Sequence, residues 1–263
     1  MCREIASELR RAIVSLKFIG ALVVAFLGLM YGGGLDLLTT ESNADAFHVF
    51  SYAYEGNNAF WLIVIAAALP YSGSLYEDYS SGCMSLSLVR QTRKMFVAAK
   101  VIACGLSGGL VVLLSCTTFF VLCLTICPAS VSFEPGHWAT LVGSAPFLEL
   151  LWEGRLPQYW LFFSIAQLMY GAFWSVFGLT ASAVFLAPAT AYVAPFAGAI
   201  ASVKAVSIGF LPDRFNFVTL AYGSYFGPPA ISMIVIAGIY FIAITVMGVI
   251  LSKSVNKMVD DEK

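Results

Sequence analysis

The residues in this sequence that could carry out catalysis are one serine and two histidines. Ser107 stands in the sequence GLSG, residues 105–108, where a serine could serve as a nucleophile if a base such as histidine lay beside it. His48 and His137 belong to separate polar segments. We therefore expect no catalytic residue in this chain, and we interpret Ser107 and its glycine neighbours as small residues that let two helices pack closely.

The sequence also lacks motifs for binding metal ions or nucleotides. Four of the six cysteines fall in one hydrophobic stretch, and we expect the set to be buried and apolar: Cys2, Cys83, Cys104, Cys116, Cys123 and Cys127. No CxxC or HExxH spacing occurs, so no metal site is predicted. No GxxxxGK(S/T) phosphate loop occurs either. We expect no cofactor in this chain, and any ATP and Mg²⁺ that drive its activity must be bound by a partner.

The composition assigns these residues to a membrane protein. Of the 263 residues, 60% are hydrophobic and only 11% are charged, and the mean hydropathy is +0.86. In a water-soluble domain about a quarter of the residues are charged, and such a domain cannot bury so much apolar surface. No basic run with interleaved aromatic residues suggests a nucleic-acid partner. We predict an all-α polytopic integral membrane protein with a single transmembrane domain over residues 1–263.

Six apolar runs are long enough to cross the membrane, because a helix needs about 20 apolar residues to span about 30 Å of hydrocarbon. The runs are Ile13–Tyr31, Ala59–Leu75, Val101–Cys127, Tyr159–Leu186, Ala191–Ile208 and Ala230–Leu251. Pro188 separates the fourth run from the fifth and permits a tight reversal. The apolar residues 18–30 resemble those of a secretory signal, but seventeen residues precede them, and we expect this helix to be retained.

Two further segments are expected at the membrane surface. Residues 1–12 place apolar residues at three- and four-residue steps opposite charged ones, which predicts an interfacial amphipathic helix. The alternative is that these residues simply begin the first span. Residues 209–229 are too aromatic for a free loop and too often broken by glycine and proline for a span. They predict a re-entrant outer segment before the last span.

The positions of lysine and arginine orient the chain. Eleven of the fourteen lie before or at the start of the first span, between the second and third, or after the last: Arg3, Arg10, Arg11, Lys17, Arg90, Arg93, Lys94, Lys100, Lys253, Lys257 and Lys263. Basic residues beside spans favour the cytoplasmic side. We predict a multi-pass protein of the plasma membrane with both termini in the cytoplasm.

The segment between the second and third spans, residues 75–100, has a mixed character. It combines six charged residues with tyrosine, methionine, leucine and phenylalanine, whereas a merely solvated loop would retain few apolar residues. A short amphipathic helix docked on a partner fits this pattern. The alternative is a helix lying on the inner leaflet, where Arg90, Arg93 and Lys94 would contact anionic membrane lipid.

This segment resembles the first cytoplasmic loop of the permeases of type 2 ATP-binding-cassette (ABC) transporters. The resemblance lies in the order of an acidic residue, tyrosine, glycine, an alternating run, two arginines and a lysine: Asp78, Tyr79, Gly82, Leu86, Leu88, Arg90, Arg93 and Lys100. Family members commonly have threonine after the glycine and proline after the first arginine, where this chain has Cys83 and Gln91. The six spans, the cytoplasmic termini and the folded-back outer segment also fit that family.

The resemblance implies the permease subunit of an ATP-driven ABC exporter. Such a subunit pairs with a second copy or a homologous permease and binds cytoplasmic ABC ATPase subunits through this loop. The substrate would be a peptide or another amphipathic molecule. The residues expected to couple the permease to the ATPase are Tyr76, Glu77, Asp78, Tyr79, Gly82, Met84, Leu86, Arg90 and Arg93. Of these, we expect the tyrosines, Met84 and Leu86 to be apolar anchors and the charged residues to fix the register at the rim.

Two other functions remain open from the sequence. An ion-coupled secondary transporter could be built from an inverted repeat of three spans, but it usually needs a carboxylate or histidine at mid-membrane, and none lies in the predicted spans. The GLSG sequence matches the GxSG form of the rhomboid intramembrane serine proteases, but that chemistry needs a base beside Ser107.

Overall fold

The described part of the chain is helical. A computed structural model of the protein describes residues 2–34, 46–51, 53–54, 60–127, 147, 150, 153–223 and 226–261. Its elements are α1 (Cys2–Ile13), α2 (Leu16–Leu29), the π-helix η1 (Met30–Gly34), α4 (Ala46–Ser51), α5 (Phe60–Ala68), α6 (Ser74–Ser80), α7 (Cys83–Arg90), α8 (Arg93–Ile126), α11 (Leu156–Phe185), α12 (Thr190–Ser207), the 3₁₀ helix η3 (Asp213–Phe215), α13 (Leu220–Gly223) and α14 (Pro229–Asp261). The all-α class predicted from the sequence is confirmed, since these ranges contain no strand.

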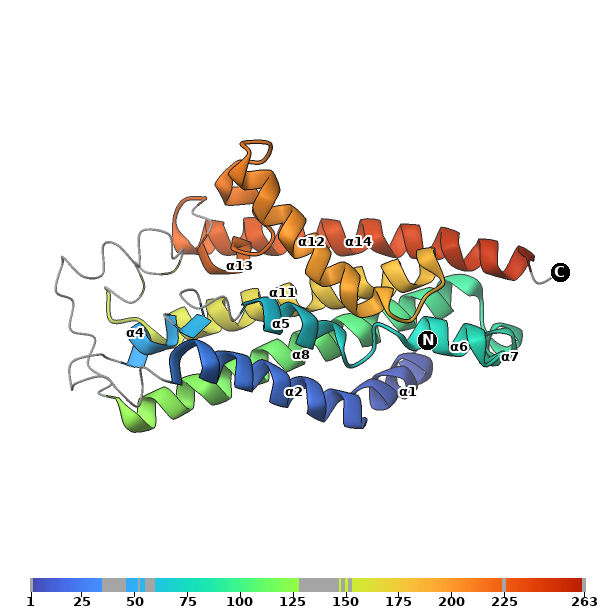
Figure 1. Cartoon of the computed structure of the whole chain (residues 1–263), viewed down its shortest axis with the longest axis horizontal. Coiled ribbons are helices and arrows are strands. Elements are labelled where there is room, and N and C mark those ends of the chain that lie inside the picture. Colours follow the sequence, from blue (N-terminus) through green and yellow to red (C-terminus); the bar gives the residue numbers. More distant parts are fainter. Residues whose placement is uncertain are drawn as a thin grey trace.

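Three long helices, α8, α11 and α14, form the body of the bundle (Figure 1). They have 34, 30 and 33 residues, and each is long and apolar enough to cross a membrane. They correspond to the predicted third, fourth and sixth spans. A fourth candidate arises if α1 and α2, which meet at a bend of 56°, are counted as one broken span.

The other three predicted spans correspond to shorter helices in the described ranges. α2 has 14 residues, α5 has 9, and α12 has 18 with Pro195 inside it. The run 59–75 was expected to be one span, but Pro70 follows the end of α5, and turns lead from there to α6. Proline has no N–H to continue the helical ladder, which explains this break. The count of six spans stays a prediction.

Glycines bring α8 and α11 into close contact. A Cβ atom on Gly171 would lie 2.5 Å from the carbonyl oxygen of Gly108, and one on Gly109 would lie 2.5 Å from that of Leu168. Side chains at these positions would therefore collide with backbone rather than with movable atoms. The expectation that small residues around Ser107 serve helix packing is confirmed at Gly108 and Gly109.

The N-terminal helix α1 is distinct in direction from α2. Ser15 separates the two, because its Oγ accepts a hydrogen bond from the backbone N–H of Phe18 at 3.1 Å and caps the start of α2. The same hydroxyl donates to the carbonyl oxygen of Ala12 at the end of α1, at 2.9 Å. The chain therefore has a defined bend here, although the position of α1 on the membrane surface stays a prediction.

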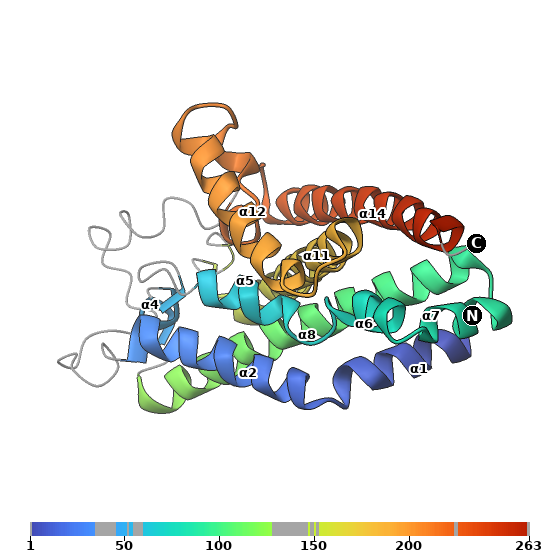
Figure 2. The same cartoon turned by 45° about the vertical axis from the view of Figure 1, so that its right-hand side comes forward.

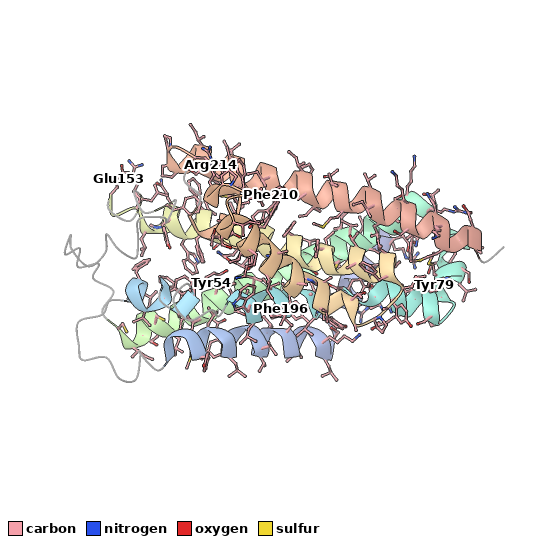
Figure 3. All side chains as sticks on the ribbon, turned by 45° about the horizontal axis from the view of Figure 1, so that its top comes forward. Tyr54, Tyr79, Glu153, Phe196, Phe210 and Arg214 are labelled. Carbon is pink, nitrogen blue, oxygen red and sulfur yellow. The ribbon has the colours of Figure 1, made fainter. Side chains whose placement is uncertain are left out.

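The segment predicted to re-enter the membrane, residues 209–229, is folded where the structure describes it. Asn216 is buried, and its Oδ1 accepts hydrogen bonds from Ser202 Oγ of α12 and from the N–H of Val218, both at 3.0 Å. Tyr240 of α14 donates to the carbonyl oxygen of Phe217 at 3.1 Å. This segment, which includes Phe210 and Arg214, lies away from the end of the bundle that carries Tyr79 (Figure 3).

Candidate functional site

The segment that resembles the ABC permease loop folds as two short helices, α6 and α7, at the same end of the bundle as α1 and the end of α14 (Figures 1 and 2). Gly82 joins the two helices with φ at 73°, in the left-handed region that favours glycine. Apart from the residues next to it in the chain, no atom of the described residues lies within 4 Å of the place where a Cβ on Gly82 would stand, so the demand for glycine here comes from backbone conformation.

A buried cluster of charges fixes α6 to the bundle. Lys100 of α8 is fully buried, and its Nζ lies 2.5 Å from Oδ2 of Asp78 in α6 and 2.9 Å from Oε2 of Glu8 in α1. The same ammonium group donates to the hydroxyl of Tyr71 at 3.1 Å, and that hydroxyl donates to Glu8. The three N–H bonds of the lysine thus meet acceptors from three different parts of the chain, which satisfies a charge that could not otherwise be buried.

A second cation completes the pairing of Asp78. Arg11 of α1 donates from Nη1 to Oδ1 of Asp78 at 2.7 Å. Partial burial by itself lowers the pKa of the Arg11 guanidinium, but the hydrogen bond and the charge of Asp78 outweigh it and raise the pKa above its ordinary value. Farther out, half-exposed Glu77 pairs with Lys17 and lies 3.9 Å from Arg11. Two helices distant in sequence, α1 and α6, are therefore joined by a buried and an outer layer of ion pairs.

Two of the predicted coupling residues are turned into the protein. Asp78 is only 4% exposed and Met84 only 2%. Met84 belongs to an apolar cluster with Phe96 of α8 and with Val255 and Met258 of α14. These side chains therefore fasten α6 and α7 to the bundle, and their surfaces are not open to a partner in this arrangement. Asp78 lies inside the site rather than at the rim where the sequence pattern suggested it.

Other predicted coupling residues face outward. Leu86 is 68% exposed and Arg90 is exposed at the end of α7. Tyr76 and Tyr79 in α6 are half-buried. These four side chains, together with half-exposed Glu77, are placed where a docked protein can reach them. Their role as contacts stays a prediction.

Arg93 connects the segment to the C-terminal helix. Its guanidinium donates from Nη2 to Oδ1 of Asp260 at 3.3 Å and from Nη1 to Oδ1 of Asn256 at 3.2 Å. Thr92, just before it, caps the start of α8 by accepting from the N–H of Met95 at 3.4 Å. The predicted coupling segment thus touches α14 as well as α1 and α8.

Sequence reasoning did not identify the partners that hold this segment in place. The sequence pattern places Glu8 and Arg11 on the polar face of a surface helix, and Lys100 among the orienting basic residues and at the end of the family motif. Glu8 and Arg11 are three residues apart and therefore lie on one face of α1. A cation directly at the start of an apolar run, as at Lys100, needs an acidic partner, and that requirement was the signal available in the sequence.

The serine considered for catalysis lies inside the bundle. Ser107 is fully buried in α8, and its Oγ donates to the carbonyl oxygen of Cys104 at 3.0 Å, as helical serines commonly do. His137 lies outside the described residues. Among the residues that the structure describes, no group of three His, Cys, Asp or Glu side chains is arranged to hold a metal ion.

No family model, curated protein or solved structure matches this chain. The resemblance to type 2 ABC permeases therefore rests on the motif in residues 75–100 and on the distribution of apolar and basic segments.

Proposed function

We propose that this protein is the membrane-spanning permease subunit of an ATP-driven exporter of the type 2 ABC class. Separate cytoplasmic ATPase subunits bind ATP and Mg²⁺ and dock on α6 and α7. The observation that carries the proposal is the pairing of buried Asp78 with buried Lys100 and half-exposed Arg11, which fixes the docking segment to two other helices.

Coupling by a separate ATPase requires a stiff connection. A partner that closes on ATP can move the permease only if the segment it contacts is rigidly attached to the transmembrane helices. Asp78 in α6 is held from α8 through Lys100 and from α1 through Arg11, so a displacement of α6 is passed to both helices. Because Lys100 and Asp78 are both buried, removing one partner of that pair costs on the order of 3–5 kcal/mol, whereas the half-exposed Arg11 contributes less.

The length of the helices supports a docking surface outside the membrane. At 1.5 Å per residue, the 34 residues of α8 extend about 51 Å, well beyond the roughly 30 Å of hydrocarbon. If the span covers residues 101–127, as the sequence predicts, the excess lies at the Arg93 end, where α6, α7 and the end of α14 gather (Figure 2). Exposed ionic side chains such as Glu77 and Arg90 belong in water at this end. By the distribution of basic residues, it faces the cytoplasm.

The proposal includes partners that a single chain does not supply. We expect the transport path to form between two permeases, either two copies of this chain or this chain and a homologue. We expect the cargo to be a peptide or another amphipathic molecule that enters from the cytoplasm or the inner leaflet. Both expectations follow from the resemblance.

Purification of the tagged chain from its native membranes tests the proposed function. We expect a second subunit with a GxxxxGK(S/T) phosphate loop to copurify, and we expect the complex to hydrolyse ATP. The chain stripped of that subunit should not hydrolyse ATP. If the chain instead purifies without an ATPase and its activity follows a proton or sodium gradient, the ion-coupled carrier becomes the better account.

A further inference from the structure

The C-terminal helix α14 has two faces of different character, and it runs along a margin of the bundle (Figures 1 and 2). Its inner face joins the buried apolar clusters through residues at three- and four-residue steps, among them Met233, Ile236, Tyr240, Leu251, Val255 and Met258. Its outward face carries four aliphatic side chains that are between 43% and 64% exposed: Ile242, Val246, Val249 and Ile250. We call these four residues the α14 stripe.

The α14 stripe leads directly into two lysines. Val246, Ile250, Lys253 and Lys257 follow one another at three- or four-residue steps, which places them on one face of the helix. Both lysines are exposed, and neither has an ion-pair partner among the described residues. The outward face of α14 therefore changes from apolar to positively charged within one turn.

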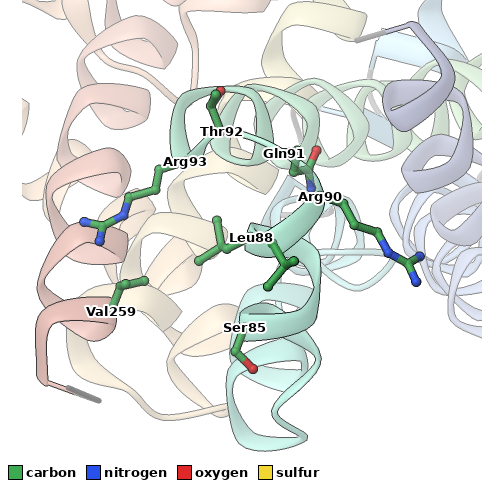
Figure 4. A pocket seen from close by; sticks show the side chains of 8 residues that line it. Ser85, Leu88, Arg90, Gln91, Thr92, Arg93 and Val259 are labelled. Carbon is green, nitrogen blue, oxygen red and sulfur yellow. The ribbon is translucent and has the colours of Figure 1, made fainter.

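Asp260, an acidic residue close to these lysines, is already engaged. Its Oδ1 accepts a hydrogen bond from Nη2 of Arg93 at 3.3 Å. Arg93 reaches from the start of α8 to α14, on the side where Val259 lies (Figure 4). The carboxylate is thus paired on the flank of α14 that meets α8, and the charges of Lys253 and Lys257 stay unbalanced on the outward face.

The length of the exposed apolar surface matches the thickness of a membrane. From exposed Ile231 to exposed Ile250, α14 rises about 29 Å at 1.5 Å per residue, and the hydrocarbon layer measures about 30 Å. Lys253 and Lys257 stand about 5 and 10 Å beyond Ile250. Long lysine side chains at this depth reach the phosphates of the lipid headgroups.

A second copy of this chain fits the α14 stripe less well than lipid does. A two-fold interface brings the same patch of both copies together, so Lys253 and Lys257 of one copy would face those of the other. Close contacts between membrane helices also favour small residues, whereas the stripe consists of branched aliphatic side chains. Flexible acyl chains can cover such a surface without bringing two backbones together.

We propose that the outward face of α14 binds an anionic phospholipid of the inner leaflet. The acyl chains lie along the α14 stripe, and the phosphate pairs with Lys253 and Lys257. The cytoplasmic leaflet is rich in anionic lipid, which supplies the complementary charge. This inference rests on the membrane orientation predicted from the basic residues and not on ATPase docking. It adds that a second permease must pair through another face of the bundle.

Photocrosslinking in vesicles of defined composition tests the site. The full chain with p-benzoylphenylalanine in place of Val249 is reconstituted without an ATPase in equal amounts of phosphatidylglycerol and phosphatidylcholine. Mass spectrometry then identifies what is bound to residue 249. We expect lipid products in which phosphatidylglycerol exceeds phosphatidylcholine about fivefold or more, because each lysine near a membrane surface favours anionic lipid by about that factor.

Three double variants assign this preference to the lysines. Lys253→Gln with Lys257→Gln should bring the ratio of the two lipids to about one, and Lys253→Arg with Lys257→Arg should keep the enrichment. Arg3→Gln with Arg10→Gln is the matched control, since both arginines are exposed on α1 and the readout stays at Val249. An enrichment that persists in the double glutamine variant would rule out these lysines as the headgroup site.

Other products at residue 249 overturn the proposal. Equal yields of the two lipids in the unchanged background would show that bulk lipid covers the α14 stripe without a preference for anionic headgroups. Crosslinks to a second copy of the chain would make the stripe an interface between permeases. Neither result bears on the copurification of an ATPase, which tests the proposed function separately.

Discussion

Lys100 Nζ and Asp78 Oδ2 lie 2.5 Å apart, and both side chains are buried, 22 positions from each other in the sequence. This pair joins the start of the first long helix, α8, to the segment proposed to meet the ATPase. Glu8 and Arg11 of α1 complete the cluster with one further charge of each sign. The formal charges of the four side chains therefore cancel, and Lys100 is the one cation that both carboxylates share.

Replacement of the buried lysine should destabilise the protein strongly. Lys100→Met keeps a long side chain but leaves Asp78 and Glu8 without their shared cation, and we expect a loss of about 3–5 kcal/mol in unfolding free energy. Lys94→Met is the matched control, because Lys94 is exposed near the start of the same helix. Thermal unfolding of both variants in detergent gives the comparison. Equal melting temperatures would mean that the buried cluster does not hold the structure together.

The pairing of α1 with α6 should restrict the motion of α1. Arg11→Ala removes the hydrogen bond to Asp78 and should release α1 from the bundle, whereas Arg10→Ala removes an exposed charge with no ion pair among the described residues. A spin label at Ser7, which is exposed on α1, should report greater mobility only in Arg11→Ala. If the spin-label spectra of Arg11→Ala and Arg10→Ala were the same, the pairing of Arg11 with Asp78 would not restrict the motion of α1.

The turn between α6 and α7 should require glycine for its conformation. Gly82→Ala has space for the added methyl group, but its φ of 73° costs about 1 kcal/mol for a residue with a Cβ atom. We expect slightly lower stability and a larger loss of ATPase coupling, because the relative direction of the two helices changes. Ser81→Ala, at the neighbouring exposed position, controls for substitution as such. ATP hydrolysis and transport measured together in the purified complex would show whether the two become uncoupled.

Close packing of α8 on α11 should not tolerate a larger residue. Gly171→Val places a branched side chain where even a Cβ would lie 2.5 Å from the carbonyl oxygen of Gly108. We expect the amount of folded protein to fall severely, since backbone must move to make room. Gly238→Val, on α14, provides the control because its Cβ would meet no atom within 4 Å. Size-exclusion profiles of the two variants should differ clearly, and similar profiles would argue against the α8 and α11 contact.

The long helices of this fold follow from local sequence, and the site does not. Runs of apolar residues predict α8, α11 and α14 because each helix needs only its own length and composition to be recognised. Pro70 was visible in the second run. Its effect depends on whether neighbouring helices supply hydrogen-bond partners for the backbone groups that the proline leaves unpaired. The apolar run therefore suggested one span where the structure has α5, a set of turns and α6.

The roles of the charged residues depended on contacts between distant parts of the chain. Asp78 was expected at the rim, because a charged residue beside tyrosines in a short amphipathic segment is normally exposed. Its burial is possible only because Lys100 and Arg11, 22 and 67 positions away, reach the same place. Periodicity within one helix carries no information about such pairs. Tertiary structure was needed to separate the residues that hold the docking segment from those that face outward.

The central claim requires α6 and α7 to face the cytoplasm, and two native cysteines test this most directly. Cys83 is exposed at the start of α7, and Cys127 follows the opposite end of α8. In a Cys2→Ser background, a membrane-impermeant maleimide should label Cys83 in inverted membrane vesicles and not in intact cells, and the cytoplasmic signal should be absent when Cys83→Ser is added. Any labelling of Cys127 should require access from outside. Labelling of Cys83 in intact cells would place the docking segment on the wrong side and contradict the proposed coupling to a cytoplasmic ATPase.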